Sequence, residues 1–441
     1  MSRYIYFESL GCAKNQVDSE ILITYAAEEG YILTDDPEKA SVIVVNTCGF
    51  IESAKKESLD VFFALKKLNP KAKIIMAGCL SERYHEKMEL DEADAIFGNH
   101  DLSLFPSVLS AVENGERVNL APPYPSAERE RDDRCHLLSR KGSAYLKISE
   151  GCNHCCSYCA IPLIRGSLRS RPEEKIIKEA ERLIRNGIYE INVVAQDLGA
   201  YGVDLYGESR FVSLMDKLSS LEGDFVLRML YIHPDTFPRS LISLVKEREK
   251  ILPYFDIPMQ HADEHVLALM NRCGNREKYL ALINSIRKEL PSAVIRTTMM
   301  LGFPSEDENA YLEMKRFIKE ARLEWMGSFL YSREEDTPAY KMRNARDHKK
   351  AAKQAALWKD EIDMIQSRIS QERMKNFVGN TYRAIIEEPI EGEAMAFGRI
   401  YAQAPDVDGT TVILGENLKE SDVVTVNVTK TLGFDLEAVR I

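Results

Sequence analysis

The 441-residue sequence has no apolar run of about 18 residues, the length that indicates a membrane-spanning helix, and no long apolar segment follows Met1. We therefore expect neither insertion into a membrane nor secretion. Basic residues are fewer than acidic ones, and the net charge of -11 argues against a broad non-specific grip on nucleic acid, which depends on Lys and Arg neutralising phosphates. A local basic patch is compatible with this balance. These absences predict a globular, cytoplasmic protein.

Disulfide bonds are not expected either. The nine cysteines are odd in number, and they occur in a long chain with no export signal. Cysteines in that context are more often metal or redox ligands than disulfide partners. Cys135 has no cysteine neighbour at ligand spacing, so we expect it to be incidental.

Four of the cysteines stand within eight positions, directly after a strand-like apolar run. Cys152, Cys156 and Cys159 form the pattern C-x3-C-x2-C, which lets one short loop present three thiolates to an iron–sulfur cubane and leaves one iron open for a substrate or cofactor. Structural zinc is the alternative, but zinc usually takes four ligands as two separated pairs. The spacing therefore favours iron–sulfur chemistry. Cys155 lies outside this register, and His154 is expected to be an ordinary loop residue.

Residues 1–121 show three short apolar runs, each followed by a helical pattern, which is typical of an open parallel α/β domain. A cysteine with a neighbouring glycine stands just beyond each run. The carboxyl ends of parallel strands form one edge of a sheet, where ligands bind, so these cysteines are expected to converge. Three separate core cysteines are the plainer alternative. The runs are 4–7, 42–45 and 74–77, and the cysteines are Cys12, Cys48 and Cys79.

Residues 122–141 are rich in charge and proline and are expected to form a linker. Residues 142–340 then alternate six strand-like runs with helical patterns, which predicts a partial (β/α)6 barrel with its active groups at the strand carboxyl ends. The runs are 145–149, 191–195, 225–230, 254–257, 294–299 and 326–330.

Two segments of different composition follow the central region. Residues 341–372 have helical spacing and predict a connecting helix. Residues 373–441 contain four or five short β patterns separated by glycine, which predicts a small antiparallel β-barrel. This last segment holds seven basic and eleven acidic residues, so its surface suits a basic protein better than RNA phosphates. The predicted fold class is α/β with a terminal all-β domain.

Several short motifs resemble one known family. The three-cysteine loop, with Tyr158 before its last cysteine, is similar to that of the radical S-adenosylmethionine (SAM) enzymes. Together with the N-terminal cysteine motifs and a TRAM-like terminal barrel, it resembles the methylthiotransferase family of these enzymes over nearly the whole chain. The motifs most similar to the ribosomal branch of that family are 9–15, 17–20, 46–50, 78–84 and 332–338.

The resemblance implies that each set of three cysteines binds a [4Fe–4S] cluster. The cluster on the central loop cleaves SAM to a radical, and the auxiliary cluster on the N-terminal cysteines supplies or carries sulfur. The family's ribosomal branch methylthiolates the β-carbon of an aspartate in small-subunit ribosomal protein twelve and uses two SAM molecules per product. The implied partners are this protein, an external electron donor and a sulfur source, whereas tRNA is not expected.

The family also implies contacts to the ribose, methionine and adenine of SAM. We expect these from residues at the strand ends, namely Tyr158, Gln196, Gln260, Arg296 and Phe303. No catalytic acid or base is predicted, because an unactivated C–H bond offers no acidic proton and a cofactor has to do this chemistry.

Two other functions remain open. A tRNA methylthiotransferase would share the domain layout, but such relatives usually carry a more basic terminal domain. A two-cluster electron carrier is the non-enzyme alternative, and the missing fourth cysteine at both sites argues against it.

The register of the loop can be tested with Cys155→Ser. We expect this variant to keep both clusters and near-normal turnover, because the neighbouring register already supplies three ligands. Iron content and product formation after anaerobic reconstitution measure this. Loss of either cluster in the variant would show that the register is wrong.

Overall fold

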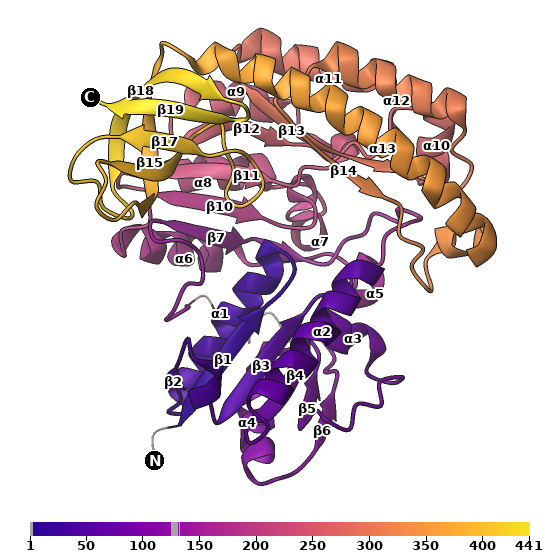
Figure 1. The fold of residues 1–441 in the computed structure, drawn as a ribbon, viewed down its shortest axis with the longest axis vertical. Helices are drawn as coiled ribbons and strands as arrows, with labels where there is room; N and C mark the ends of the chain where they lie inside the picture. Colours follow the sequence, from indigo (N-terminus) through magenta and orange to yellow (C-terminus); the bar gives the residue numbers. More distant parts are fainter. Residues whose placement is uncertain (1–2, 125–130, 132) are drawn as a thin grey trace.

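The computed structural model describes residues 3–124, 131 and 133–441, and places them in three domains (Figure 1). The N-terminal domain forms the lower lobe in this view, and the central domain lies above it with the terminal barrel and a long helix against it. Within the described ranges, no helix combines the length and the apolar composition needed to cross a bilayer.

The N-terminal domain is an open six-stranded parallel sheet of order β2-β1-β3-β4-β5-β6. Its strand β3 is buried throughout, because α1 and α4 pack on one face of the sheet and α2 packs on the other. The elements are β1 (Tyr4–Ser9), α1 (Ala13–Glu28), β2 (Ile32–Leu33), η1 (Pro37–Lys39), β3 (Val42–Thr47), α2 (Glu52–Leu68), β4 (Lys73–Gly78), α3 (Cys79–Tyr84), β5 (Ala95–Phe97), η2 (Leu102–Leu104), α4 (Phe105–Glu113) and β6 (Val118–Leu120).

The central domain is a six-stranded parallel sheet of order β14-β13-β12-β11-β10-β7, which confirms the expected partial barrel. Two short antiparallel strands, β8 and β9, flank the cysteine loop and α5. The elements are β7 (Ser143–Lys147), β8 (Ser149–Glu150), α5 (Ile161–Arg165), β9 (Arg169–Ser170), α6 (Glu173–Arg185), β10 (Glu190–Val194), η4 (Leu198–Ala200), α7 (Val203–Tyr206), α8 (Phe211–Ser219), β11 (Val226–Leu230), η5 (Pro234–Thr236), α9 (Ser240–Glu247), β12 (Ile251–Asp256), α10 (Glu264–Leu269), α11 (Arg276–Glu289), β13 (Val294–Leu301), α12 (Glu308–Ala321) and β14 (Trp325–Leu330).

Helices of the central domain bury one apolar stripe each against the sheet. In α6, Ile176, Ala180 and Leu183 are buried at spacings of four and three, while acidic residues fill the first turn and basic residues the last, which complements the helix dipole. Several helices begin at an Asp or Asn whose side chain accepts a backbone N–H of the first turn. These caps are Asp263 for α10, Asn275 for α11 and Asp307 for α12.

The terminal domain is a closed five-stranded barrel of order β15-β16-β17-β19-β18. It differs from the expected antiparallel barrel in one pair, because β17 and β19 run parallel. A closed ring with an odd number of strands cannot alternate direction all the way round, so one parallel pair is unavoidable. The elements from the connecting segment onward are η6 (Pro338–Lys341), α13 (Ala345–Met374), η7 (Lys375–Phe377), β15 (Thr381–Pro389), β16 (Met395–Ile400), β17 (Thr411–Leu414), β18 (Val423–Leu432) and β19 (Asp435–Arg440).

The terminal barrel and α1 together cover the sheet face that the central helices leave open. One hydrophobic cluster joins Val17 of α1 to Tyr254 and Trp325 of the central strands and to the barrel core. Trp325 donates its indole N–H to the carbonyl oxygen of Ala402 at 2.7 Å, and Tyr254 donates its hydroxyl to Asp408 at 2.6 Å. The polar tips of these large side chains therefore bind the barrel to the sheet.

The segment expected to be a linker contains no helix or strand among its described residues, and residues 125–130 and 132 of it lie outside them. Its described arginines tie it to both neighbouring domains. Arg134 contacts Glu20 of α1 and lies 2.6 Å from Glu179 of α6, and Arg131 lies 2.7 Å from Glu28 of α1. This part of the segment is thus a packed connection between the two domains.

A buried charge cluster lies where the barrel meets the central sheet. Glu190 of β10 lies between Arg228 at 2.7 Å and Arg399 of the barrel at 2.6 Å. Arg399 also binds Glu387 at 2.6 Å. Glu387 is therefore turned into the interface and adds little to the acidic surface of the barrel, to which Glu388 still contributes as an exposed residue.

We expect Glu190→Gln to lower the free energy of unfolding by about 3–5 kcal/mol, because it leaves two buried guanidinium groups short of a charge. Burial alone would raise the pKa of Glu190, but the two arginines lower it from 4.5 to about 2. The contribution is therefore complete above pH 4.5 and is lost as the pH falls toward 2. Urea unfolding at pH 7 measures the loss, with Glu181→Gln, an exposed change on α6, as the control. An unchanged midpoint for Glu190→Gln would contradict this assignment.

Candidate functional site

The three N-terminal cysteines lie at the carboxyl ends of neighbouring strands. Cys12 precedes α1, Cys48 follows β3, and Cys79 begins α3 directly after β4. Strands β1, β3 and β4 are adjacent in the sheet, so the three loops meet at one edge. Two glycines permit the close approach: a methyl group on Gly11 would lie 3.0 Å from Cβ of Cys48, and one on Gly49 would lie 2.7 Å from the carbonyl oxygen of Cys79.

Positive charge surrounds these thiols. Burial raises the pKa of Cys79 to about 12 and also raises that of Cys48. Desolvation by the surrounding protein acts in the same direction on Cys12, although this thiol is exposed, but Lys14, Arg165 and two backbone N–H groups of α1 outweigh it and lower the Cys12 pKa. Cations and N–H donors of this kind stabilise the thiolate form of sulfur. The donor set therefore fits an anionic group bound through thiolates.

The loop cysteines lie between β8 and α5. The backbone N–H groups of His154 and Ile161 each donate to a cysteine sulfur at 3.4 Å, to Cys152 and Cys159 respectively. Burial raises the pKa of Cys152 to about 11 and that of Cys159 to about 12. These half-buried thiols keep their protons at pH 7 unless a metal replaces them, which suits ligands that exchange a proton for iron.

The remaining residues of the loop are fixed to the central domain. Tyr158 accepts an N–H of Arg272 at 3.1 Å, and Arg272 donates a second one to the carbonyl oxygen of Pro258 at 2.6 Å. Cys155 is exposed, and its thiol donates to the carbonyl oxygen of Asn153 at 3.6 Å. The side chain of Cys155 is thus occupied away from the buried thiols, which supports its exclusion from the ligand set.

His154 has contacts that the sequence did not indicate. Its Nε2 lies 2.8 Å from Oδ2 of Asp197, and its ring stacks on His233 with centroids 4.0 Å apart. Asp197 also accepts the backbone N–H groups of Gly199 and His233, at 2.9 and 3.0 Å. This carboxylate therefore anchors the cysteine loop to the ends of β10 and β11.

Each of the two cysteine sites offers three thiols as donors. No three His, Cys, Asp or Glu side chains in the described ranges lie close enough together to hold one metal ion. A cubane binds each thiolate to a different iron, so it spaces its protein ligands more widely than a single ion does. Three thiols at each site, with cations beside the N-terminal set, suit such a group.

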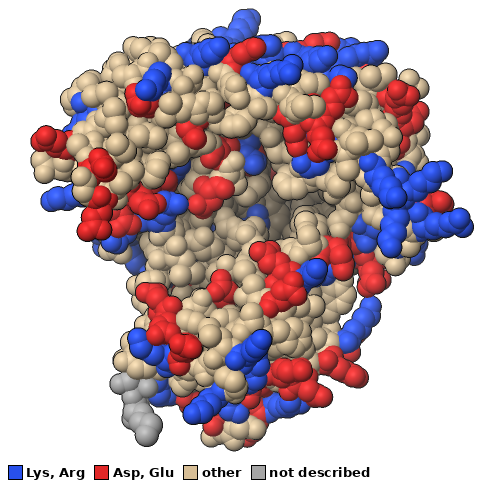
Figure 2. Space-filling model, viewed as in Figure 1, with Lys and Arg blue, Asp and Glu red and all other residues tan. Residues whose placement is uncertain are grey.

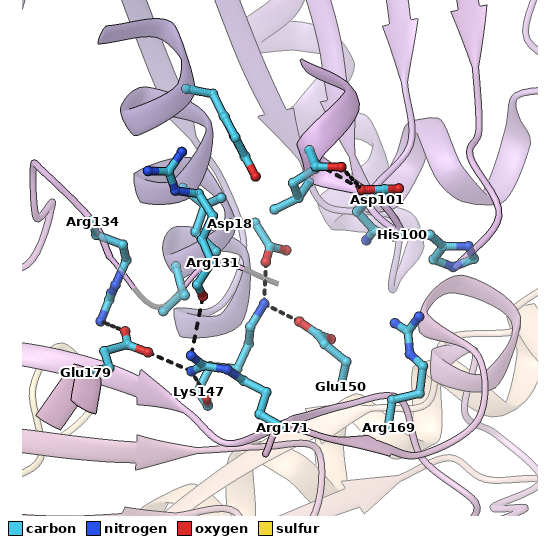
Figure 3. Close-up of a pocket in the computed structure, with 16 residues that line it drawn as sticks. Asp18, His100, Asp101, Arg131, Arg134, Lys147, Glu150, Arg169, Arg171 and Glu179 are labelled. Carbon is cyan, nitrogen blue, oxygen red and sulfur yellow. Dashed lines mark hydrogen bonds and ion pairs between the residues drawn. The ribbon is translucent and has the colours of Figure 1, made fainter. Parts of the chain in front are cut away.

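Arg165 joins the two sites. It is the last residue of α5, which follows the loop cysteines, and it is 3 % exposed. Its guanidinium donates to Sγ of Cys79 at 3.3 Å and forms ion pairs with Asp18 at 2.8 Å and Glu150 at 2.9 Å. Lys147 lies 2.6 Å from Asp18 and also contacts Glu150. Figure 3 shows Asp18, Lys147 and Glu150 converging between α1 and the central sheet.

A small cavity of about 60 Å³ lies beside this network and is lined by charged residues from both domains (Figure 3). A pocket for a molecule the size of SAM needs about 300 Å³ or more, so this cavity is a gap in the domain interface. Figure 2 shows a hollow between the N-terminal lobe and the rest of the molecule.

Three of the five residues expected to contact SAM lie near the strand carboxyl ends. Tyr158 lies in the cysteine loop, and Gln196 follows β10 and donates to Glu150 at 3.3 Å. Gln260 takes a left-handed backbone with φ of 69°, which its hydrogen bonds to β13 maintain. The expectation of cofactor contacts at these positions stays a prediction.

The other two residues have structural partners. Arg296 lies 3.4 Å from Asp256 and 3.4 Å from Asp408 of the terminal barrel. Phe303 is fully buried, and its ring packs against Tyr331. Arg296 thus lies at the barrel interface and the Phe303 side chain in the hydrophobic core, and the expectation that either residue contacts SAM also stays a prediction.

Sequence reasoning missed the charges that join the domains, although two signals were present. Lys147 is a charge inside an apolar strand-like run, and a charge in a buried strand needs a partner. Glu150 and Arg165 flank the cysteine loop within a few residues on either side. Asp18 gave no such signal, because a charged residue on a helix is usually exposed.

Comparison with known proteins agrees with this architecture. Family models match at residues 4–98 (uncharacterized protein family UPF0004), 146–318 (radical SAM superfamily) and 378–441 (TRAM domain). The radical SAM methyltransferase TsrM from Kitasatospora setae has a TM-score of 0.57 at 14% identity, covering 77% of each chain. The cobalamin-dependent radical SAM enzyme OxsB has a TM-score of 0.53 at 12% identity, covering 80% of this chain and 56% of that one. At these identities the likeness shows the fold alone.

The fold, the family models and the three-cysteine loop define a radical SAM enzyme, which uses a [4Fe–4S] cluster and SAM. Curated relatives are more specific. The ribosomal protein uS12 methylthiotransferase RimO of Treponema denticola is 39% identical over 470 residues, covering 98% of this chain and 99% of the relative. RimO of Clostridioides difficile is 39% identical over 438 residues, covering 98% and 97%. The chain belongs to the RimO family of methylthiotransferases.

Arg165→Lys tests the link between the sites. The variant keeps the charge but loses the forked donors that reach Cys79, Asp18 and Glu150 together. We expect the N-terminal cysteine site to lose metal affinity by roughly 10- to 100-fold, as is typical when a group that orients a ligand is removed. Chelator competition measures this, with the exposed Arg185→Lys as the control. Equal iron retention in both variants would contradict the role of Arg165.

Proposed function

We propose that this chain methylthiolates ribosomal protein uS12 of the small subunit at the β-carbon of an aspartate, and that it uses two SAM molecules per product. The observation that carries the proposal is that the two three-cysteine sites meet at one domain interface. Arg165 ends the helix that follows the loop cysteines, and its side chain contacts Cys79 of the N-terminal set. Membership of the RimO family supports it, because the relatives bear the uS12 methylthiotransferase name. The relatives do not favour the tRNA alternative.

Each set of cysteines would hold one [4Fe–4S] cluster, which makes two per chain. The loop cysteines would leave one iron for SAM, and the N-terminal cysteines would hold the auxiliary cluster. When bound, these groups supply the electron, the radical chemistry and the sulfur that an unactivated C–H bond requires.

The chain's own residues enclose and position the reacting groups. Cys79 packs with Ala160 and Ile164 of the central domain, and Phe50 lies against this group. These apolar contacts exclude water between the two cysteine sites, which protects a reactive carbon centre from side reactions. Arg165 and Lys14 balance the negative charge of bound thiolates in the same place.

The surface of the terminal barrel would receive the protein substrate. Glu388 near the end of β15 is exposed, and so are Glu391 and Glu393 on the turn between β15 and β16. A ribosomal protein is expected to be basic because it binds RNA, and opposite charges mainly raise the association rate. We infer a cytoplasmic location from this substrate, and an external electron donor and sulfur source as further partners.

The cluster count is tested by iron analysis after anaerobic reconstitution. We expect about eight irons per chain in the wild type, and about four when either set of cysteines is changed to alanine. The variant that lacks the N-terminal set should still cleave SAM, whereas the variant that lacks the loop set should not. Zinc at similar stoichiometry, or one cluster in the wild type, would refute the two-cluster assignment.

The substrate is tested by mass spectrometry of purified uS12 and of tRNA after incubation with the reconstituted enzyme, SAM, a reductant and sulfide. We expect a methylthio group on one aspartate of uS12 and an unmodified tRNA. Modified tRNA with unmodified uS12 would overturn the proposed function.

A further inference from the structure

The first turns of α13 carry a set of positive charges without partners. Arg346, Lys349, Lys350 and Lys353 are all exposed, and none has an ion-pair partner within the described part of the chain. At about 100° per residue, spacings of three and four place all four on one helix face. We call this set the basic stripe.

The stability of the helix does not account for the basic stripe. Cations near a helix N-terminus face the positive end of the macrodipole and are unfavourable there. Two like-charge pairs four residues apart add repulsion. Asp347, the acid within the stripe's length, is held by the capping residue Asn344 at 2.8 Å. Later in the same helix, by contrast, Lys359 pairs with Asp363 at 2.6 Å.

The segment that leads into the stripe is bound to the cysteine loop and to the residues after β13. One turn earlier, Arg343 donates to the carbonyl oxygens of Gly302 and Phe303 after β13, at 3.1 and 3.3 Å. Ala339 of η6 donates its backbone N–H to the carbonyl oxygen of Ser157 in the cysteine loop at 2.8 Å. Figure 2 shows a group of basic side chains at the right edge, where α13 begins in Figure 1.

We propose that the basic stripe docks the phosphate backbone of small-subunit ribosomal RNA, so that the enzyme captures uS12 on a subunit more readily than as a free protein. This inference rests on the proposed function. Lys and Arg side chains are the groups that contact nucleic-acid phosphates. A free basic protein would be repelled by the stripe, whereas a subunit presents RNA phosphates next to that protein.

The charge distribution supports one orientation of docking. The chain as a whole carries a net charge of -11, so most of its surface repels RNA. The stripe lies at the start of α13, whereas the exposed acids Glu388, Glu391 and Glu393 belong to the barrel, which is joined to its other end. Phosphates and a basic protein would thus be attracted to separate surfaces.

The test compares the wild type with Arg346→Gln/Lys349→Gln/Lys350→Gln/Lys353→Gln, in which glutamine keeps the helix propensity. Binding to purified small subunits is measured by sedimentation over a range of salt concentrations. We expect the slope of log affinity against log salt to fall in magnitude by about 3, because four phosphate contacts are lost. Methylthiolation of uS12 within subunits should fall by about tenfold or more at moderate salt. Methylthiolation of free uS12 should not fall, because the stripe only repels a free basic protein, and SAM cleavage should be unchanged.

The matched control is Lys67→Gln/Lys71→Gln/Lys178→Gln/Lys288→Gln. It removes the same charge from exposed lysines that also lack ion-pair partners in the described ranges but are scattered over separate elements. We expect this control to bind subunits nearly as the wild type does, with at most a small change from the altered net charge.

Several results would overturn the inference. If the stripe variant loses as much methylthiolation activity on free uS12 as on subunits, the stripe supports the active site. If the control variant loses as much affinity for subunits as the stripe variant does, only the net charge matters. If the variant binds subunits more weakly but binds purified small-subunit RNA as the wild type does, the partner of the stripe is a protein. If the variant loses affinity only for tRNA, the partner is tRNA. A wild type that modifies neither form of uS12 refutes the proposed function, and the binding measurement, which needs no turnover, still decides the role of the stripe.

Discussion

Four buried charges hold the catalytic architecture together: Asp18 of α1 on one side, and Lys147, Glu150 and Arg165 of the central domain on the other. Each is less than a tenth exposed, and two positive and two negative groups leave the set neutral. A charge buried without its partner costs several kcal/mol, so the domains can dock only where all four pair at once. Because Arg165 also contacts Cys79, this single alignment fixes the distance between the two cysteine sites. The chemistry of the enzyme depends on that alignment.

The face of the central sheet is divided between two other parts of the chain. The terminal barrel covers one end through Tyr254, Trp325 and the charge cluster at Glu190, and α1 covers the other end through Val17. A hollow lies between the N-terminal lobe and the rest of the molecule (Figure 2). The proposed chemistry takes place between the domains, while the two proposed recognition surfaces lie on the outside and carry opposite charge. Residues on these outer surfaces can therefore change without altering the residues between the domains.

Much of the fold could be predicted from the sequence, because strands of a parallel sheet are buried on both faces and appear as continuous apolar runs. All six central strands were predicted in this way, and so was the meeting of the N-terminal cysteines at one sheet edge. The strands β2, β5 and β6 were not, since two or three residues are too few to show a pattern. The pairing of Asp18 with Arg165, and the inward turn of Glu387, depend on contacts between distant segments that a single sequence does not display.

The length of α13 has a consequence of its own. Its 30 residues form one continuous helix from the segment bound to the cysteine loop to the terminal barrel, a span of about 45 Å at 1.5 Å per residue. A continuous helix of this length fixes both the distance and the rotation between the parts that it joins. Inserting or deleting one residue would turn the barrel by about 100° relative to the sheet and separate Glu190 from Arg399. Length variation among relatives should therefore concentrate in surface loops, and this helix should keep its number of turns.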